Sequence, residues 1–156
     1  PLTHAGEPKL ASNRTVGKLE VVATFDGPMP TGVTVSQKGR VFVNYPRWGD
    51  PVTFTVAEVK GGKPIAYPDE RLAVFDKSRP TETLVSVQSV VVDPDDRLWI
   101  LDTGSIEFGP VMPGGAKLVG VDLASDRVFK TISFPPEVAL KTTYLNDIRF
   151  DLRQGK

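Results

Sequence analysis

The sequence predicts an all-β fold of the β-propeller type, and three observations lead to this prediction. Two similar stretches begin at Thr31 and Gln88, which are 57 residues apart, and pair Arg40 with Arg97. A third copy begins 58 residues later, at Asn146, shortly before the chain ends. Apolar residues within the copies alternate with a period of two, which is typical of strands. Repeats of this length that hold several strands are typical of propeller blades.

The chain before the first repeat is expected to contain an arm and one strand. Residues 1–17 show no periodicity and are interpreted as an amino-terminal arm. Residues 18–156 are the expected partial propeller. Within them, residues 18–30 hold Lys18–Phe25, which is similar to the predicted outer strand at Arg127–Phe134. We interpret it as the strand that closes the last blade, because an unpaired outer strand needs a partner.

Residues 31–87 are predicted to form the first blade. Val33 and Val35 indicate the first strand, and Ser36–Gly39 is rich in residues that tolerate tight turns. The second strand follows at Val41–Tyr45. The third and fourth strands are expected at residues 53–59 and 63–67, joined by a turn at Gly61 and Gly62.

Residues 88–145 are predicted to form the second blade, and residues 146–156 the start of a third. Asp93–Asp96 is expected to be a hairpin turn rather than a calcium-binding loop, since it lacks the continuation of an EF-hand. The third and fourth strands are expected at residues 117–122 and 127–134. The third copy stops before its second strand, so we expect the chain to be part of a larger repeat protein.

The composition excludes several kinds of partner and chemistry. The 19 basic and 19 acidic residues cancel, so neither a nucleic acid nor a membrane surface is an expected partner. Cysteine is absent, which excludes disulfides and thiolate chemistry within the chain. The single histidine, His4, lies in the predicted arm, so no Ser-His-Asp triad is expected.

The long connections predict where a ligand would bind. Connections between the first and second strands, and between the third and fourth, are short, while the others are long. In an up-and-down blade all long connections emerge on one face, and loops on a rigid scaffold carry function. Thr31 and Gln88 begin equivalent strands and are expected to line the central channel. The other candidate ligand-binding residues on this face are Arg47, Trp48, Asp50, Asp102, Glu107, Phe108 and Tyr144.

The two tryptophans have different predicted roles. Trp99 is equivalent to Phe42 in the repeat, so we expect it to pack between blades. Trp48 lies in a long loop beside Arg47 and Asp50, where an aromatic face suits a cationic or ring-bearing ligand. Packing within the loop is the alternative for Trp48. Asp102-Thr-Gly104 is similar to an aspartic-protease motif, but its repeat counterpart has no acid, so protease chemistry is not expected.

Three segments resemble successive signatures of the yellow / major royal jelly protein family, in its bacterial branch. They are Gly39–Trp48, Asp96–Gly104 and Tyr144–Asp151. The resemblance implies a six-bladed β-propeller, of which this chain would hold somewhat over two blades. It also implies a secreted or periplasmic protein whose partners are a small-molecule ligand and the remaining blades. Family functions include tautomerase activity and binding of small amines, so the resemblance fixes the fold better than the function.

A more distant similarity, to the gluconolactonase / senescence-marker family, provides an alternative function. That family holds a divalent metal with carboxylate and amide side chains at the starts of innermost strands. Asn146 and Asp147 match its Asn-Asp pair and are candidate ligands for a cation such as Ca²⁺. A strand-initiating turn is the alternative for this pair. Thr31 stands where that family has a glutamate ligand, so the match is incomplete.

The sequence thus leaves three functions open. The first is a yellow-type propeller that binds or modifies a small organic molecule at the channel mouth, as a tautomerase if it is an enzyme. The second is a metal-dependent lactonase, in which the cation polarises the lactone carbonyl. The third is a non-catalytic platform for protein interactions, which an extensive exposed apolar surface would favour.

Overall fold

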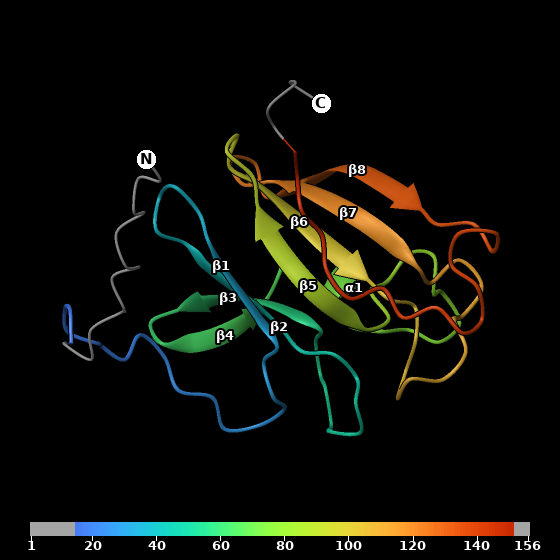
Figure 1. Ribbon diagram of the computed structural model, residues 1–156, viewed down its shortest axis with the longest axis horizontal. Helices are drawn as coiled ribbons and strands as arrows, with labels where there is room; N and C mark the ends of the chain where they lie inside the picture. Colours follow the sequence, from blue (N-terminus) through green and yellow to red (C-terminus); the bar gives the residue numbers. More distant parts are fainter. Residues whose placement is uncertain (1–14, 152–156) are drawn as a thin grey trace, which may run out of the picture.

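Two four-stranded antiparallel sheets make up almost all the regular structure in a computed structural model that describes residues 15–151 (Figure 1). The first sheet holds β1 (Gly32–Val35), β2 (Val41–Asn44), β3 (Val56–Lys60) and β4 (Lys63–Ala66) in sequence order. The second holds β5 (Val87–Val92), β6 (Arg97–Asp102), β7 (Lys117–Asp122) and β8 (Arg127–Ser133), also in sequence order. The predicted all-β, propeller-type fold is confirmed.

The repeat in the sequence reappears as a repeat in backbone geometry. Both predicted hairpins between first and second strands form, and their equivalent residues Gly39 and Asp96 both have positive φ, at 79° and 58°. Asp can adopt this left-handed conformation at small cost and Gly at none. Gly32 is required for a different reason, because a Cβ there would collide with the Asn44 Oδ1 atom.

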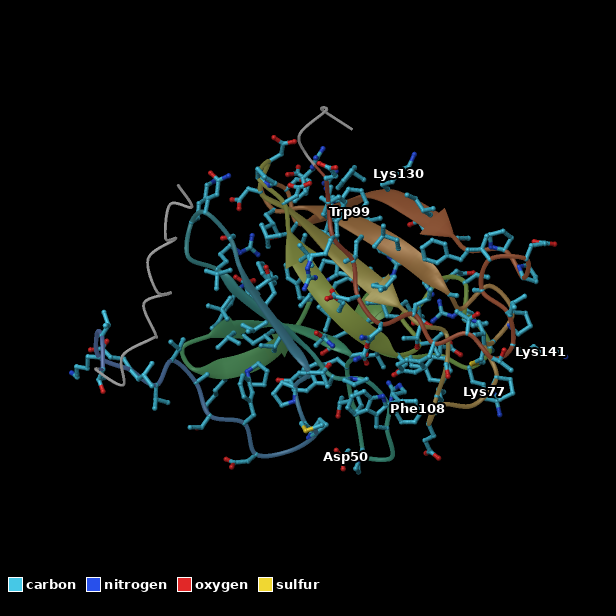
Figure 2. The ribbon with its side chains drawn as sticks, viewed as in Figure 1. Asp50, Lys77, Trp99, Phe108, Lys130 and Lys141 are labelled. Atoms are coloured by element: carbon cyan, nitrogen blue, oxygen red, sulfur yellow. The ribbon has the colours of Figure 1, made fainter. Side chains whose placement is uncertain are left out.

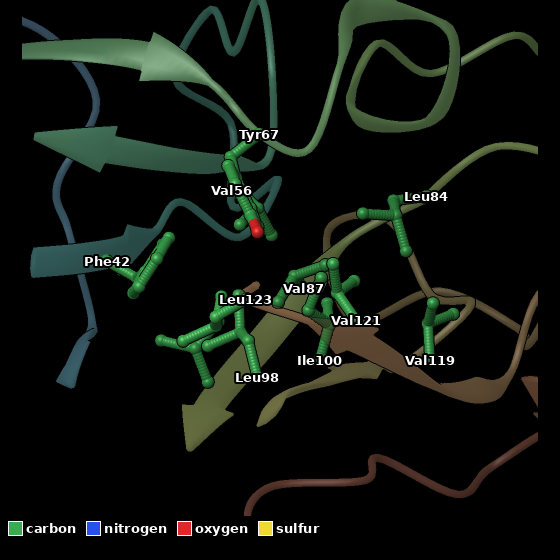
Figure 3. Close-up of a cluster of buried hydrophobic side chains, with 11 residues drawn as sticks. Phe42, Val56, Tyr67, Leu84, Val87, Leu98, Ile100, Val119, Val121 and Leu123 are labelled. Atoms are coloured by element: carbon green, nitrogen blue, oxygen red, sulfur yellow. The ribbon is translucent and has the colours of Figure 1, made fainter. Parts of the chain in front are cut away.

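The main core lies between the two sheets, and Figure 3 shows the side chains that form it. Phe42 and Val56 of the first sheet meet Leu98 and Ile100 of the second, and all four are fully buried. Each such side chain contributes roughly 1.5–3 kcal/mol by leaving water. Because side chains alternate between the two faces of a strand, one face of each sheet is apolar and packs against the other sheet.

The opposite face of the second sheet is covered by the start of the third repeat. Trp99 packs there with Leu101 and Leu118, against Leu145, Ile148 and Phe150. The Trp99 indole donates a hydrogen bond to Asp93 (2.8 Å), and its ring lies 5.3 Å from that of Phe150. The predicted packing role of Trp99 between repeats is confirmed.

Arg40 ties the two sheets together at the end where the short hairpins lie. Its guanidinium forms two hydrogen bonds with Glu58 of β3, at 2.7 and 2.8 Å. It also donates to the Leu123 carbonyl oxygen and to Asp126, both in the second repeat, at 2.8 Å. The Tyr67 hydroxyl donates to the same Asp126 carboxylate (2.6 Å). The Arg40 side chain thus joins β3 of the first sheet to the turn between β7 and β8 of the second sheet.

The structure differs from the sequence prediction in three segments. A four-residue helix, α1 (Glu70–Ala73), begins at the cap residue Asp69 within a connection predicted as a loop. Residues 18–25 form no strand, and their predicted partner lies beyond Lys156, so the closing strand stays a prediction. Residues 146–151 pack against the second sheet without forming a strand. His4 lies outside the described residues.

Candidate functional site

An open cavity of about 540 Å³ lies where the three repeats meet. Strand β1 lies beside β5, and the third repeat runs along the other side of β5 (Figure 1). The three equivalent residues Thr31, Gln88 and Asn146 all line this cavity, while their ligand-binding and metal-binding roles stay predictions. Asp147 and Arg149 also line it. The repeat thus places one polar side chain per blade around a common space.

An aromatic cluster lies on the side of the long connections. The rings of Trp48 and Phe108 are stacked at 5.5 Å with an interplanar angle of 23°, and the rings of Phe108 and Tyr144 are 4.9 Å apart. Phe108 remains 63% exposed, and Figure 2 shows it toward the lower edge of the molecule, with Asp50. Three connections that are distant in sequence therefore supply one partly exposed aromatic surface.

Hydrogen bonds connect the aromatic cluster to the cavity. The Trp48 indole N–H donates to the Tyr144 hydroxyl (2.6 Å), which donates to Gln88 Oε1 (3.1 Å). Gln88 Nε2 in turn donates to Asn146 Oδ1 (3.2 Å). Burial raises the pKa of Tyr144, although the bond from Trp48 opposes the shift, so the hydroxyl keeps its proton at neutral pH. This relay joins four of the predicted site residues.

Arg47 and Asp102 support the loops from within and do not line the cavity. Arg47 donates to the carbonyl oxygens of Val85 (2.9 Å) and Val52 (2.6 Å), and burial lowers its pKa although Asp102 opposes this. Asp102 is fully buried and accepts hydrogen bonds from three backbone amides. It also forms a buried ion pair with Lys117 (2.9 Å). These two predicted binding residues therefore position the loops.

Asp50 and Glu107 are exposed residues of the long connections. Neither side chain lines the cavity at the three repeats. The backbone amide of Glu107 donates to the Arg47 carbonyl oxygen (2.8 Å), which holds the two loops together. Glu107 and Phe108 both have positive φ, at 50° and 58°. This left-handed pair turns the loop so that Phe108 meets Trp48.

The predicted calcium ligands are engaged in other contacts. Asn146 Oδ1 accepts a bond from Gln88, and Asp147 Oδ1 accepts bonds from Ser89 (2.8 Å) and Arg149 (2.6 Å). Partial burial would raise the pKa of Asp147, but the bonds from Ser89 and Arg149 outweigh it and lower the pKa. No group of three or more His, Cys, Asp or Glu side chains suited to a metal occurs among residues 15–151. Ca²⁺ prefers six to eight oxygen ligands, most of which would have to come from outside the described residues, so the calcium site stays a prediction.

Ser89 and Arg149 are among the cavity residues that sequence reasoning missed. Arg149 lies two residues after Asp147 and reaches the cavity beside it, where its guanidinium donates to Asp147 Oδ1 (2.6 Å). Ser89 directly follows Gln88, and the register of β5 against β6 is shifted between Val87 and Ser89. This irregularity, which turns Ser89 toward the third repeat, has no signal in the sequence.

Comparison with known proteins supports the resemblance seen in the motifs. The profile of the major royal jelly protein family matches residues 85–156. A yellow-related salivary protein of Lutzomyia longipalpis is 33% identical over 124 residues, which cover 66% of this chain and 30% of that protein. The chain belongs to the yellow / major royal jelly protein family. The membership is consistent with the propeller-type sheets described above.

Other members of the yellow family match at similar identity. The L-dopachrome tautomerase yellow-f of Drosophila melanogaster is 32% identical over 70% of this chain and 27% of its own length. Major royal jelly protein 7 of Apis mellifera is 32% identical over 68% of this chain and 24% of its own length. The chain thus spans less than a third of the length of these relatives. In residues 15–151, no helix has the length and apolar character needed to cross a bilayer.

Proposed function

We propose that this protein binds, or chemically modifies, a small organic molecule at the cavity where its repeats meet. The observation that carries the proposal is the convergence of Thr31, Gln88 and Asn146 on one cavity, joined by hydrogen bonds to an exposed aromatic cluster. A concave site with a few convergent polar groups and nearby aromatic rings is the usual form of a small-molecule site. The remaining blades of a six-bladed propeller would complete its wall.

One of the relatives matched is named as an L-dopachrome tautomerase. We therefore propose tautomerisation as the first activity to test in this protein. We also propose that the protein is secreted, since other relatives are named as salivary or royal jelly proteins. A tautomerase moves a proton between two positions of its substrate and needs groups that bind the carbonyl oxygen. The amides of Gln88 and Asn146 are groups of this kind.

The test uses the protein expressed with its complete natural sequence, called the intact protein below. Loss of L-dopachrome absorbance is followed with wild type, Gln88→Ala and a control, Gln37→Ala, on an exposed hairpin. We expect accelerated loss with wild type and the control, and about tenfold less with Gln88→Ala. Binding of L-dopachrome without turnover would support the binding protein over the enzyme. Neither binding nor turnover would refute this substrate.

A further inference from the structure

The direction of each hydrogen bond in the relay follows from one residue, Trp48. An indole N–H can only donate, so the Tyr144 hydroxyl must accept from it. The hydroxyl proton of Tyr144 then donates to Gln88, which has to present its carbonyl oxygen. The Gln88 amide nitrogen therefore points toward Asn146, which must present its own oxygen in turn. The network thus fixes the orientation of both amides.

This orientation leaves three amide N–H donors available to a ligand. Asn146 Oδ1 already accepts one hydrogen bond, whereas both N–H groups of Asn146 and the second N–H of Gln88 make no hydrogen bond in residues 15–151. Thr31 adds no free proton, since its hydroxyl accepts from Asn44 (2.8 Å) and donates to the Gln88 carbonyl oxygen (3.5 Å). The cavity between β1, β5 and the third repeat is therefore rich in donors.

The charges at the cavity do not favour a cation either. Asp147 is the only carboxylate among the described lining residues, and Arg149 lies 2.6 Å from it. The two charges cancel, so the lining as a whole is neutral. A neutral lining with unpaired N–H donors stabilises an oxygen that only accepts hydrogen bonds.

We propose that Gln88 and Asn146 bind a carboxylate or carbonyl oxygen of a ring-bearing ligand, and that Trp48 is the positioning residue that orients them. This inference rests on the proposed function, since it names the ligand class of the same cavity. The aromatic cluster at the other end of the relay suits the ring of such a ligand. A cation at the calcium site expected from Asn146 and Asp147 would compete with Gln88 for Asn146 Oδ1.

The test compares two ligands that share an indole ring and differ in the charged group. Calorimetry on the intact protein measures binding of indole-3-acetate and of tryptamine. We expect wild type to bind indole-3-acetate at least about tenfold more tightly. Asn146→Asp, which replaces the amide donor with an acceptor of the same shape, is expected to reverse the preference. The control Gln37→Glu adds the same charge on a distant hairpin and is expected to leave it unchanged.

A second variant tests the positioning role. Trp48→Phe keeps an aromatic ring beside Phe108 but removes the N–H that sets the direction of the relay. We expect both ligands to bind it with nearly equal affinity. Preference of wild type for tryptamine, or Ca²⁺ binding that Asn146→Ala abolishes, would overturn the inference while leaving a cavity that binds small molecules. Binding of neither indole, together with L-dopachrome turnover that Asn146→Asp leaves unchanged, would overturn the inference and leave the proposed function standing.

Discussion

Single polar residues at equivalent repeat positions take on different tasks in this protein. Arg40 and Arg97 begin equivalent second strands, yet Arg40 reaches into the neighbouring repeat while Arg97 pairs with Asp93 and Asp95 of its own hairpin. The side chain of Glu58, which receives two bonds from Arg40, is only 6% exposed. Removal of the Arg40 guanidinium would leave the Glu58 carboxylate without its main partner in a site that is largely shielded from water.

Arg40→Met is therefore expected to lower the free energy of unfolding of the intact protein by about 2 kcal/mol. The matched variant Arg97→Met loses contacts within its own sheet, to Asp93, Asp95 and the Phe129 ring. It is expected to cost less than Arg40→Met, because Asp93 keeps hydrogen bonds from the Trp99 indole and from two backbone amides. Urea denaturation of the two variants measures the difference. Equal losses would show that the inter-repeat bonds of Arg40 add nothing to the stability.

Glu58 predicts how stability depends on pH. The hydrogen bonds from Arg40 lower the pKa of Glu58 in the folded protein, although burial opposes this shift. A lowered folded pKa contributes stability above the unfolded value of about 4.3, and this contribution disappears as pH falls through the folded pKa. Glu58→Gln should thus destabilise the protein by about 1–2 kcal/mol at pH 7 and much less near pH 3. Urea denaturation at both pH values measures this; a pH-independent cost would contradict the assignment.

At the scale of the elements, the buried pair of Lys117 and Asp102 organises the long connections. The Lys117 ammonium donates to Asp102 (2.9 Å) and to the carbonyl oxygens of Pro80 (2.8 Å) and Gly115 (3.1 Å). Asp102 holds the amides of Val85 and Ser86, which precede β5. The pair therefore fixes the connection into β5 and the connection between β6 and β7 relative to each other.

Lys117→Met is expected to destabilise the intact protein by about 3–5 kcal/mol, because it leaves a buried carboxylate unpaired. The double variant Asp102→Asn/Lys117→Met removes both charges and should recover part of this loss. Thermal unfolding of the three proteins provides the comparison. A double variant no more stable than Lys117→Met would mean that the backbone bonds of Asp102, and not its charge, hold the loops.

At the scale of the whole molecule, the two sheets differ in how well their outer faces are covered. The inner strands of the second sheet pack against the first sheet on one side and against residues 145–150 on the other, while its outer strand β8 is exposed. The far side of the first sheet leaves Val33 66% exposed and Val35 55% exposed, and Leu19 and Val21 beside it are also exposed. Equivalent positions in the second sheet, such as Val90, are buried. We therefore predict that another blade covers this face.

The 156 residues expressed alone are therefore expected to self-associate or to melt without cooperativity, because an uncovered blade face is apolar. Size-exclusion chromatography with light scattering and a thermal melt followed by circular dichroism measure the two properties. A monomer with a sharp, cooperative transition would show that the exposed face of the first sheet needs no cover.

The sequence by itself predicted the strands of both sheets, because alternation with a period of two is a local property. The spacing from Thr31 to Gln88 to Asn146 predicted the shared position of these three residues, although residues 146–151 form no strand. The three motif segments also identified the family, because a motif is a run of neighbouring residues that can be compared directly with relatives. The short α1 helix escaped prediction because a capped single turn leaves little pattern.

Only the tertiary structure decided what the predicted site residues do. Asp102 and Arg47 look like exposed loop residues in the sequence, but long-range contacts bury Asp102 fully and Arg47 partly beneath the loops. The relay from Trp48 to Asn146 joins residues 96, 56 and 58 positions apart in successive bonds. Which atom of each amide faces the cavity depends on partners that only folding brings together, and no local pattern encodes that choice.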